Sequence, residues 1–180
     1  MSLDRTPVQE AQLDVSDDFS EIYHKYFPRL YKYILYRVGD LNTAEDLVSD
    51  VFEKALAKYN TYCPDKGKLS TWLFTIANNT LTNYFKKKNQ NTELINLNHV
   101  ESRDRLEDLI IDRELKEVLL KSMAYLNDRQ KNAIALKFGA CLTNRQIAQM
   151  MNITESNVGT IIFRSLKKLK DVLKEQNIIF

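Results

Sequence analysis

The chain is short of the residues that interrupt helices and of those that build covalent or metal-bound frameworks. Its 180 residues include only four Gly, three Pro, two Cys and two His. Few Gly and Pro, together with little strand-like alternation, predict an all-α protein. Two cysteines are too few for a disulfide framework, and with the two histidines they form no metal-ligand cluster. We therefore expect a reduced chain with no zinc site and no cofactor.

Long apolar runs are also absent from the sequence. No stretch approaches the ~20 consecutive apolar residues that a membrane-spanning helix needs. The N-terminus lacks the basic-then-apolar pattern of a secretory signal peptide. These absences predict a cytoplasmic protein that does not insert into a membrane.

Charge is distributed unevenly along the chain. Residues 1–18 carry a net charge of −4, residues 19–88 carry +4, residues 89–112 carry −4 and residues 113–180 carry +6. Two basic segments separated by an acidic one predict two small helical domains that face nucleic acid, at 19–88 and 113–180, joined by a flexible acidic linker at 89–112. The first 18 residues are polar and lack helical periodicity, so we expect a disordered arm there.

The clearest pattern in the sequence is a helix-turn-helix between residues 143 and 168. Thr143 and Gln146 have the spacing of a capping box at the start of the first helix. Asn152 stands at the turn, where a left-handed residue is needed, and Thr154 caps the second helix. In such a pair the second helix enters the major groove of DNA. The alternative is an ordinary helical hairpin, which the agreement of apolar, small and turn positions disfavours.

The N-terminal basic segment contains a helix with one acidic face. Three carboxylates share a narrow sector opposite the apolar stripe: Asp46, Asp50 and Glu53. A solvated helix surface explains them most simply. The functional alternative is docking against a basic helix of a partner protein.

A second helix of this segment, expected from Ser70 onwards, has an unusual outward face. Pro64, Asp65 and Gly67 mark a loop before it. Trp72 and several Asn and Thr residues then precede a run of lysines, a combination typical of binding to single-stranded nucleic acid. The alternative is that Trp72 belongs to the core and that the lysines only favour the helix dipole.

Five stretches together resemble the bacterial sigma-70 family, and in particular its small extracytoplasmic-function (ECF) group. YHKYFPRLYKYI, AEDLVSDVFEKAL and STWLFTIANNTLTNYFKK resemble successive parts of region 2, while YLNDRQKNAIALKF and the helix-turn-helix resemble region 4. The resemblance implies a non-enzymatic factor that directs promoter-specific transcription initiation. Its implied partners are core RNA polymerase, through the largest-subunit coiled coil and the flap, promoter DNA and an anti-sigma factor, with no small-molecule substrate.

The resemblance also assigns roles to particular residues. Asp46, Asp50 and Glu53 would bind core polymerase. The minus-ten surface, which captures an unpaired base of the melted strand, would comprise Tyr62, Lys66, Lys68, Trp72, Asn79, Asn83, Lys86 and Lys87. The minus-thirty-five reader would comprise Thr143, Glu155, Ser156, Asn157, Thr160, Arg164, Lys167 and Lys168.

The chain departs from several relatives in the second helix of the helix-turn-helix. Gly159 and Ile161 stand near places where those relatives carry Arg, so we expect readout to depend more on DNA shape and phosphate contacts. Two other functions explain the sequence less well. The chain could be a stand-alone helix-turn-helix regulator with a helical sensor or dimerisation domain. That interpretation does not explain the Trp-and-Asn helix or the acidic linker. An enzyme acting on nucleic acid would need a complete metal site or a Gly-rich phosphate loop, and the sequence contains neither.

Overall fold

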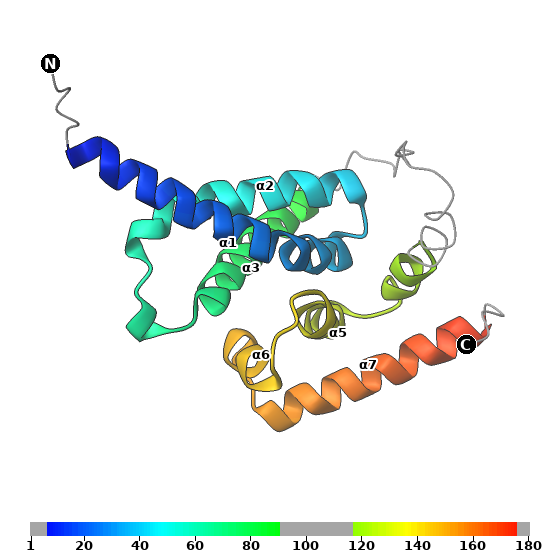
Figure 1. Cartoon of the computed structure of the whole chain (residues 1–180). Coiled ribbons are helices and arrows are strands. Elements are labelled where there is room, and N and C mark those ends of the chain that lie inside the picture. Colours follow the sequence, from blue (N-terminus) through cyan, green and yellow to red (C-terminus); the bar gives the residue numbers. More distant parts are fainter. Residues whose placement is uncertain (1–6, 91–116, 176–180) are drawn as a thin grey trace, which may run out of the picture.

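The computed structural model describes residues 7–90 and 117–175, and these fold as an all-helical protein (Figure 1). The first group of helices is α1 (Pro7–Val38), α2 (Leu41–Lys58) and α3 (Leu69–Gln90), with short 3-10 turns η1 (Tyr59–Thr61) and η2 (Pro64–Lys66) between the last two. The second group comprises a helix over residues 117–123, then α5 (Asp128–Ile134), the π-helical turn η3 (Ala135–Gly139), α6 (Asn144–Met151) and α7 (Glu155–Glu175). The groups correspond to the two predicted domains. The predicted linker lies outside the described residues, except that residues 89 and 90 end α3.

The first helix begins earlier than the sequence analysis predicted. It runs from Pro7, so the expectation of a disordered arm is wrong for residues 7–18, whose backbone is helical. The physical reason is that no Gly or Pro follows Pro7 before Phe19, and Pro is favoured at the first position of a helix. A helix that is anchored by packing further along can therefore extend through this polar segment.

A tight corner joins α1 to α2. Gly39 has φ +76°, a left-handed conformation that glycine adopts without strain, and its N–H donates to the carbonyl of Leu35 at 2.8 Å. Asp40 then caps α2, because its carboxylate accepts the backbone N–H of Thr43 at 2.8 Å. The helix starts at Leu41, directly after this cap. The loop after α2 contains the predicted turn residues, and α3 begins at Leu69, directly before Ser70.

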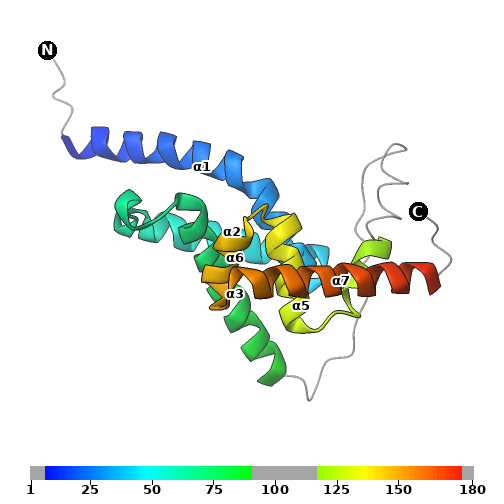
Figure 2. The same cartoon turned by 90° about the horizontal axis from the view of Figure 1, so that it is seen from below.

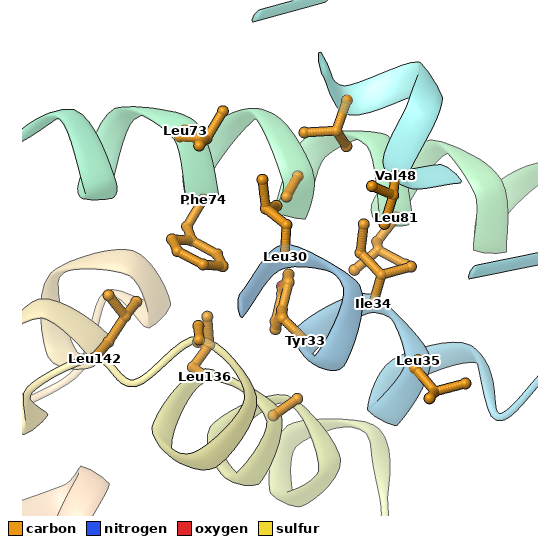
Figure 3. Packing of buried hydrophobic residues seen from close by; sticks show 14 of the residues in the cluster. Leu30, Tyr33, Ile34, Leu35, Val48, Leu73, Phe74, Leu81, Leu136 and Leu142 are labelled. Atoms are coloured by element: carbon orange, nitrogen blue, oxygen red, sulfur yellow. The ribbon is translucent and has the colours of Figure 1, made fainter. Parts of the chain in front are cut away.

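The three helices of the first group bury one apolar core. The predicted stripe of α2 faces inward, with Ala44, Leu47, Val48, Val51, Phe52 and Ala55 buried. It meets Leu30 and Ile34 of α1 and Leu81 of α3, each at most 1% exposed (Figure 3). Amphipathic periodicity was therefore sufficient to predict which faces of these helices are buried.

The second group is built from capped helices. Asn127 and Gln130 form a reciprocal capping box at the start of α5, and Thr143 and Gln146 form the predicted one at α6. Asn152 adopts the left-handed conformation (φ 52°, ψ 51°) at the turn between α6 and α7. These observations confirm the helix-turn-helix, whose shared face is closed by the buried side chains of Ile147, Ala148 and Val158.

The two groups pack directly against each other. Tyr33 of α1 and Phe74 of α3 are buried facing Leu136 of η3 and Leu142, which stands just before α6 (Figure 3). A single cluster of buried residues therefore runs from α1 through to α7. The predicted pair of domains is present, but the sequence analysis did not anticipate that they share an interface.

Candidate nucleic-acid interface

The acidic face of α2 is open to solvent. Asp46, Asp50 and Glu53 are all exposed, and their spacing of four and three residues places them on one side of the helix. Asp50 also lies 3.6 Å from the ammonium group of Lys54, in an ion pair between exposed side chains. Such pairs contribute little to stability, so the carboxylates remain available to a partner.

Tyr62 and Trp72 form an aromatic pair at the start of α3. Their ring centroids are 5.5 Å apart at an interplanar angle of 47°, and the Tyr62 hydroxyl donates to the carbonyl of Gly67 at 3.1 Å. Both side chains are half-buried, so Trp72 contributes to the core and still presents part of its ring to solvent. Lys68 beside them is exposed, while the side chain of Lys66 lies outside the described residues.

The outward face of α3 carries free amide groups and positive charge. Asn79 and Asn83 are exposed, and so are Lys86 and Lys87 further along the helix. Figure 2 shows this C-terminal end of α3 projecting beyond the other helices. The threonine hydroxyls of this face are turned back onto their own helix, for example Thr75, which donates to the carbonyl of Thr71 at 2.7 Å. Amide groups are therefore the main hydrogen-bonding groups that this face offers a ligand.

The second helix of the helix-turn-helix, α7, presents its predicted residues outward. Thr154 caps it by accepting the N–H of Asn157 at 3.2 Å. The following candidate residues are all exposed: Glu155, Ser156, Asn157, Thr160, Arg164, Lys167 and Lys168. Thr143 is exposed as well, but its hydroxyl is occupied by the capping box with Gln146.

The structure also brings together polar residues that the sequence analysis missed. The guanidinium of Arg29 on α1 donates from Nε to the carbonyl of Ala140 at 2.9 Å, and it lies near the rings of Tyr26 and Phe74. The Tyr33 hydroxyl lies 3.2 Å from Oδ1 of Asn78 on α3 and 3.2 Å from Oδ1 of Asn132 on α5. These hydrogen bonds join residues 45 to 111 positions apart, so no local pattern could have indicated them.

Burial at this interface changes the ionisation of its groups. Burial raises the pKa of Tyr33 far above its usual range, so the hydroxyl stays protonated and remains a hydrogen-bond donor. Burial also lowers the pKa of Arg37, whose Nη1 donates to the carbonyl of Asp128 at 2.9 Å. The interface is thus held by neutral and cationic donors on α1 that meet oxygen acceptors of the second group and of α3.

The described parts of the chain contain neither a metal-ligand cluster nor a helix that could span a membrane. Within residues 7–90 and 117–175, no three His, Cys, Asp or Glu side chains lie close enough together to hold a metal ion. None of the helices in those same ranges has an apolar stretch long enough to cross a bilayer.

Comparison with known proteins places both halves of the chain. Residues 22–91 match sigma-70 region 2, and residues 116–169 match sigma-70 region 4. The ECF sigma factor SigM of Bacillus subtilis is 30% identical over 151 residues, which cover 83% of this chain and 91% of SigM. The chain belongs to the sigma-70 family. Its similarity to named ECF factors places it in the ECF group of that family.

Other similarities agree with this sigma-70 membership. The ECF sigma factor BldN of Streptomyces coelicolor is 31% identical over 173 residues, covering 93% of this chain but only 65% of BldN. The solved structure of the sigma factor RpoE from Bartonella quintana, in complex with the anti-sigma factor NepR, matches with a TM-score of 0.71. That match covers 87% of this chain and 97% of RpoE at 22% identity, and it shows a shared fold.

Proposed function

We propose that this protein is a sigma factor that binds core RNA polymerase and directs promoter-specific transcription initiation. The observation that carries the proposal is that a chain of the sigma-70 family exposes two different surfaces suited to binding nucleic acid. One is the aromatic, amide-rich and basic face of α3, and the other is the polar and basic face of α7. A factor with these surfaces needs no catalytic site of its own, because the polymerase performs the chemistry.

The α3 surface is suited to melted DNA of the minus-ten element. Asn79 and Asn83 offer exposed amides to the edges of an unpaired base, and the half-exposed ring of Trp72 offers a stacking surface. Lys68, Lys86 and Lys87 would neutralise the phosphates of the same strand. Holding an unstacked base in this way favours the open state, because the new contacts replace those lost from the duplex.

The α2 surface is suited to the polymerase itself. Asp46, Asp50 and Glu53 form an exposed acidic row beside a basic nucleic-acid surface, where a DNA contact would be repulsive. A basic helix, such as one helix of the coiled coil in the largest polymerase subunit, is the complementary partner. The second domain would contact the polymerase flap.

The α7 surface is suited to duplex DNA of the minus-thirty-five element. Ser156, Asn157 and Thr160 lie in the first two turns of α7, which is the part of a recognition helix that reaches base edges. Arg164, Lys167 and Lys168 follow on later turns, where they would contact phosphates.

The proposal extends to regulation and location. The RpoE structure of the comparison is a complex with the anti-sigma factor NepR, and we infer that this ECF member is likewise controlled by an anti-sigma partner. A factor that works with RNA polymerase acts in the cytoplasm of a bacterial cell.

The decisive experiment is transcription by bacterial core RNA polymerase with and without the purified full chain, on a pool of DNA with randomised upstream sequence. Initiation that depends on the chain, from templates sharing two motifs at a fixed spacing, is the expected result. Absence of stimulation, together with specific binding of the chain alone to a duplex site, would overturn the proposal in favour of a stand-alone helix-turn-helix regulator.

A further inference from the structure

The outward surface of α7 contains a large apolar side chain that the proposed function has not used. Phe163 is 70% exposed, more than Tyr125 at 54%, Leu56 at 51%, or any other exposed large hydrophobic residue in the described ranges. It lies in the third turn of a 21-residue helix that carries the proposed DNA-reading residues. Covering an apolar ring that is largely exposed to water with another apolar surface is energetically favourable.

The helical geometry places Phe163 in the middle of the proposed DNA surface. Val158, Ile162, Ser165 and Leu169 are buried and mark the inward side of α7. Each of Ser156, Thr160, Phe163 and Lys167 stands two residues before one of them, which is about 200° around a helix of 3.6 residues per turn. These four therefore form one row on the side facing away from the core. In Figure 1, α7 lies along one edge of the molecule, with α5 and α6 on one side of it.

The side chain next to Phe163 in this row is also partly apolar. The hydroxyl of Thr160 donates to the carbonyl of Ser156 at 3.1 Å, so it is occupied within its own helix. Its methyl group and the lone pairs of the hydroxyl oxygen are left to meet a ligand, but its donor is not. The centre of the row thus offers a ring and a methyl group, while the hydrogen-bonding and charged groups of Ser156 and Lys167 lie towards its two ends.

The major groove contains one kind of apolar group that identifies a base, the C5-methyl group of thymine. A phenylalanine ring has no donor or acceptor for the other groups at the base edges. We propose that Phe163 reads a thymine of the upstream duplex element through its C5-methyl group. This inference rests on the proposed entry of α7 into the major groove. It gives the chain a direct base contact in the proposed recognition helix.

The test removes only the methyl group from the DNA. Deoxyuridine has the hydrogen-bonding groups of thymidine without the C5-methyl, so each thymine of the selected upstream motif is replaced singly by uracil. Binding of holoenzyme, reconstituted from core polymerase and the full chain, is then measured by competition on duplex promoter DNA. Replacement of thymine by uracil at one position is expected to weaken binding about fourfold. This factor corresponds to one methyl group withdrawn from apolar contact.

Variants of the protein assign that effect to Phe163. Phe163→Ala should bind the thymine and uracil duplexes equally, and Phe163→Leu should restore part of the difference because it restores apolar contact. Leu166→Ala is the matched control, since Leu166 is another exposed apolar residue of α7 (43%) that lies outside the row. It should keep the full loss of affinity that follows replacement of thymine by uracil, here called the uracil effect. Thermal unfolding checks that all three variants are folded, as expected for exposed positions.

Several outcomes would overturn the inference. A selected motif without thymine, equal binding of every uracil duplex by the wild type, or a uracil effect that persists in Phe163→Ala would each exclude the methyl contact. If Phe163→Ala keeps the uracil effect and instead loses affinity for core polymerase, the ring faces a protein. Failure of the proposed function is distinguishable, because the wild-type chain would then stimulate no initiation on any template.

Discussion

Gly139 lies directly against the backbone of Tyr33. A Cβ atom on Gly139 would stand 2.8 Å from the amide nitrogen of Tyr33 and 2.9 Å from its Cα, distances that no backbone of a packed helix can accept without moving. The contact joins the end of η3 in the second domain to the C-terminal part of α1 in the first. Glycine is required here for close approach of two backbones, and the domain interface depends on it.

Substituting Gly139 should therefore weaken the protein through this interface. Gly139→Ala is expected to lower the free energy of unfolding by about 1–3 kcal/mol, the usual cost of overpacking a well-packed site. Gly159→Ala is the matched control, because a Cβ there meets nothing within 4 Å and the residue lies inside α7. It should raise stability by roughly 0.5–1 kcal/mol. Urea unfolding of both variants measures the difference, and equal effects would show that the close contact does not hold in solution.

The cap at the start of α2 should make stability depend on pH. Hydrogen bonds from the side chain and the backbone amide of Thr43 hold the pKa of Asp40 below its ordinary value. The folded state thus binds a proton less readily than the unfolded state. The resulting stabilisation is fully present above the unfolded pKa of about 3.9 and is lost as the pH falls through the lower folded pKa.

Two substitutions separate the hydrogen bond from the charge. Asp40→Ala should cost about 1 kcal/mol at pH 7, whereas Asp40→Asn should cost little because Asn caps helices equally well. Between pH 5 and pH 3 the wild type should lose stability relative to Asp40→Asn, since only the wild type titrates at this position. Thermal unfolding of the three proteins across that range measures it. A constant difference between wild type and Asp40→Asn would contradict the assignment of the pKa shift.

Asn79 should act on promoter melting without acting on polymerase binding. Removing one amide contact to an unpaired base costs about 1 kcal/mol, so Asn79→Ala should lower open-complex formation about fivefold while its affinity for core polymerase stays unchanged. Permanganate footprinting of the melted region and a core-binding titration measure the two quantities. Asn42→Ala, at an exposed asparagine of α2, is the control. Equal loss of binding and melting in Asn79→Ala would count against the role.

Asp50 should act on polymerase binding first. Asp50→Lys reverses a charge in the exposed acidic row and should reduce affinity for core polymerase about tenfold or more, since like charges that face each other across an interface are repulsive. Its ion pair with Lys54 is exposed, so stability should change little. Glu21→Lys makes the same charge change on an exposed part of α1 and should bind normally. Unchanged affinity in Asp50→Lys would remove α2 from the docking role.

Local patterns predicted the elements of this fold well. The stripe of α2, the capping box at Thr143 and the left-handed Asn152 all follow from interactions within a few residues, which a sequence displays directly. The helical backbone of residues 7–18 was missed because the pattern there is polar.

Long-range contacts were not predictable by the same means. Arg29, Tyr33 and Gly139 look ordinary in their own segments, and their importance comes from partners about a hundred residues away. The candidate site shows a similar division. Exposure of the acidic row and of the α7 residues followed from periodicity, whereas the hydrogen bond from Tyr62 to the carbonyl of Gly67 could be seen only in the structure.

The shared core of the two domains also affects every later binding event. Because Tyr33, Phe74, Leu136 and Leu142 are buried together, a partner that holds the two domains apart must first expose them. The observed affinity of such a partner equals its intrinsic affinity multiplied by the fraction of molecules already open, and each 1.4 kcal/mol of domain contact reduces that fraction about tenfold. Substitutions far from any DNA or polymerase contact can therefore tighten or loosen binding, simply by setting how much of the protein is ready to bind.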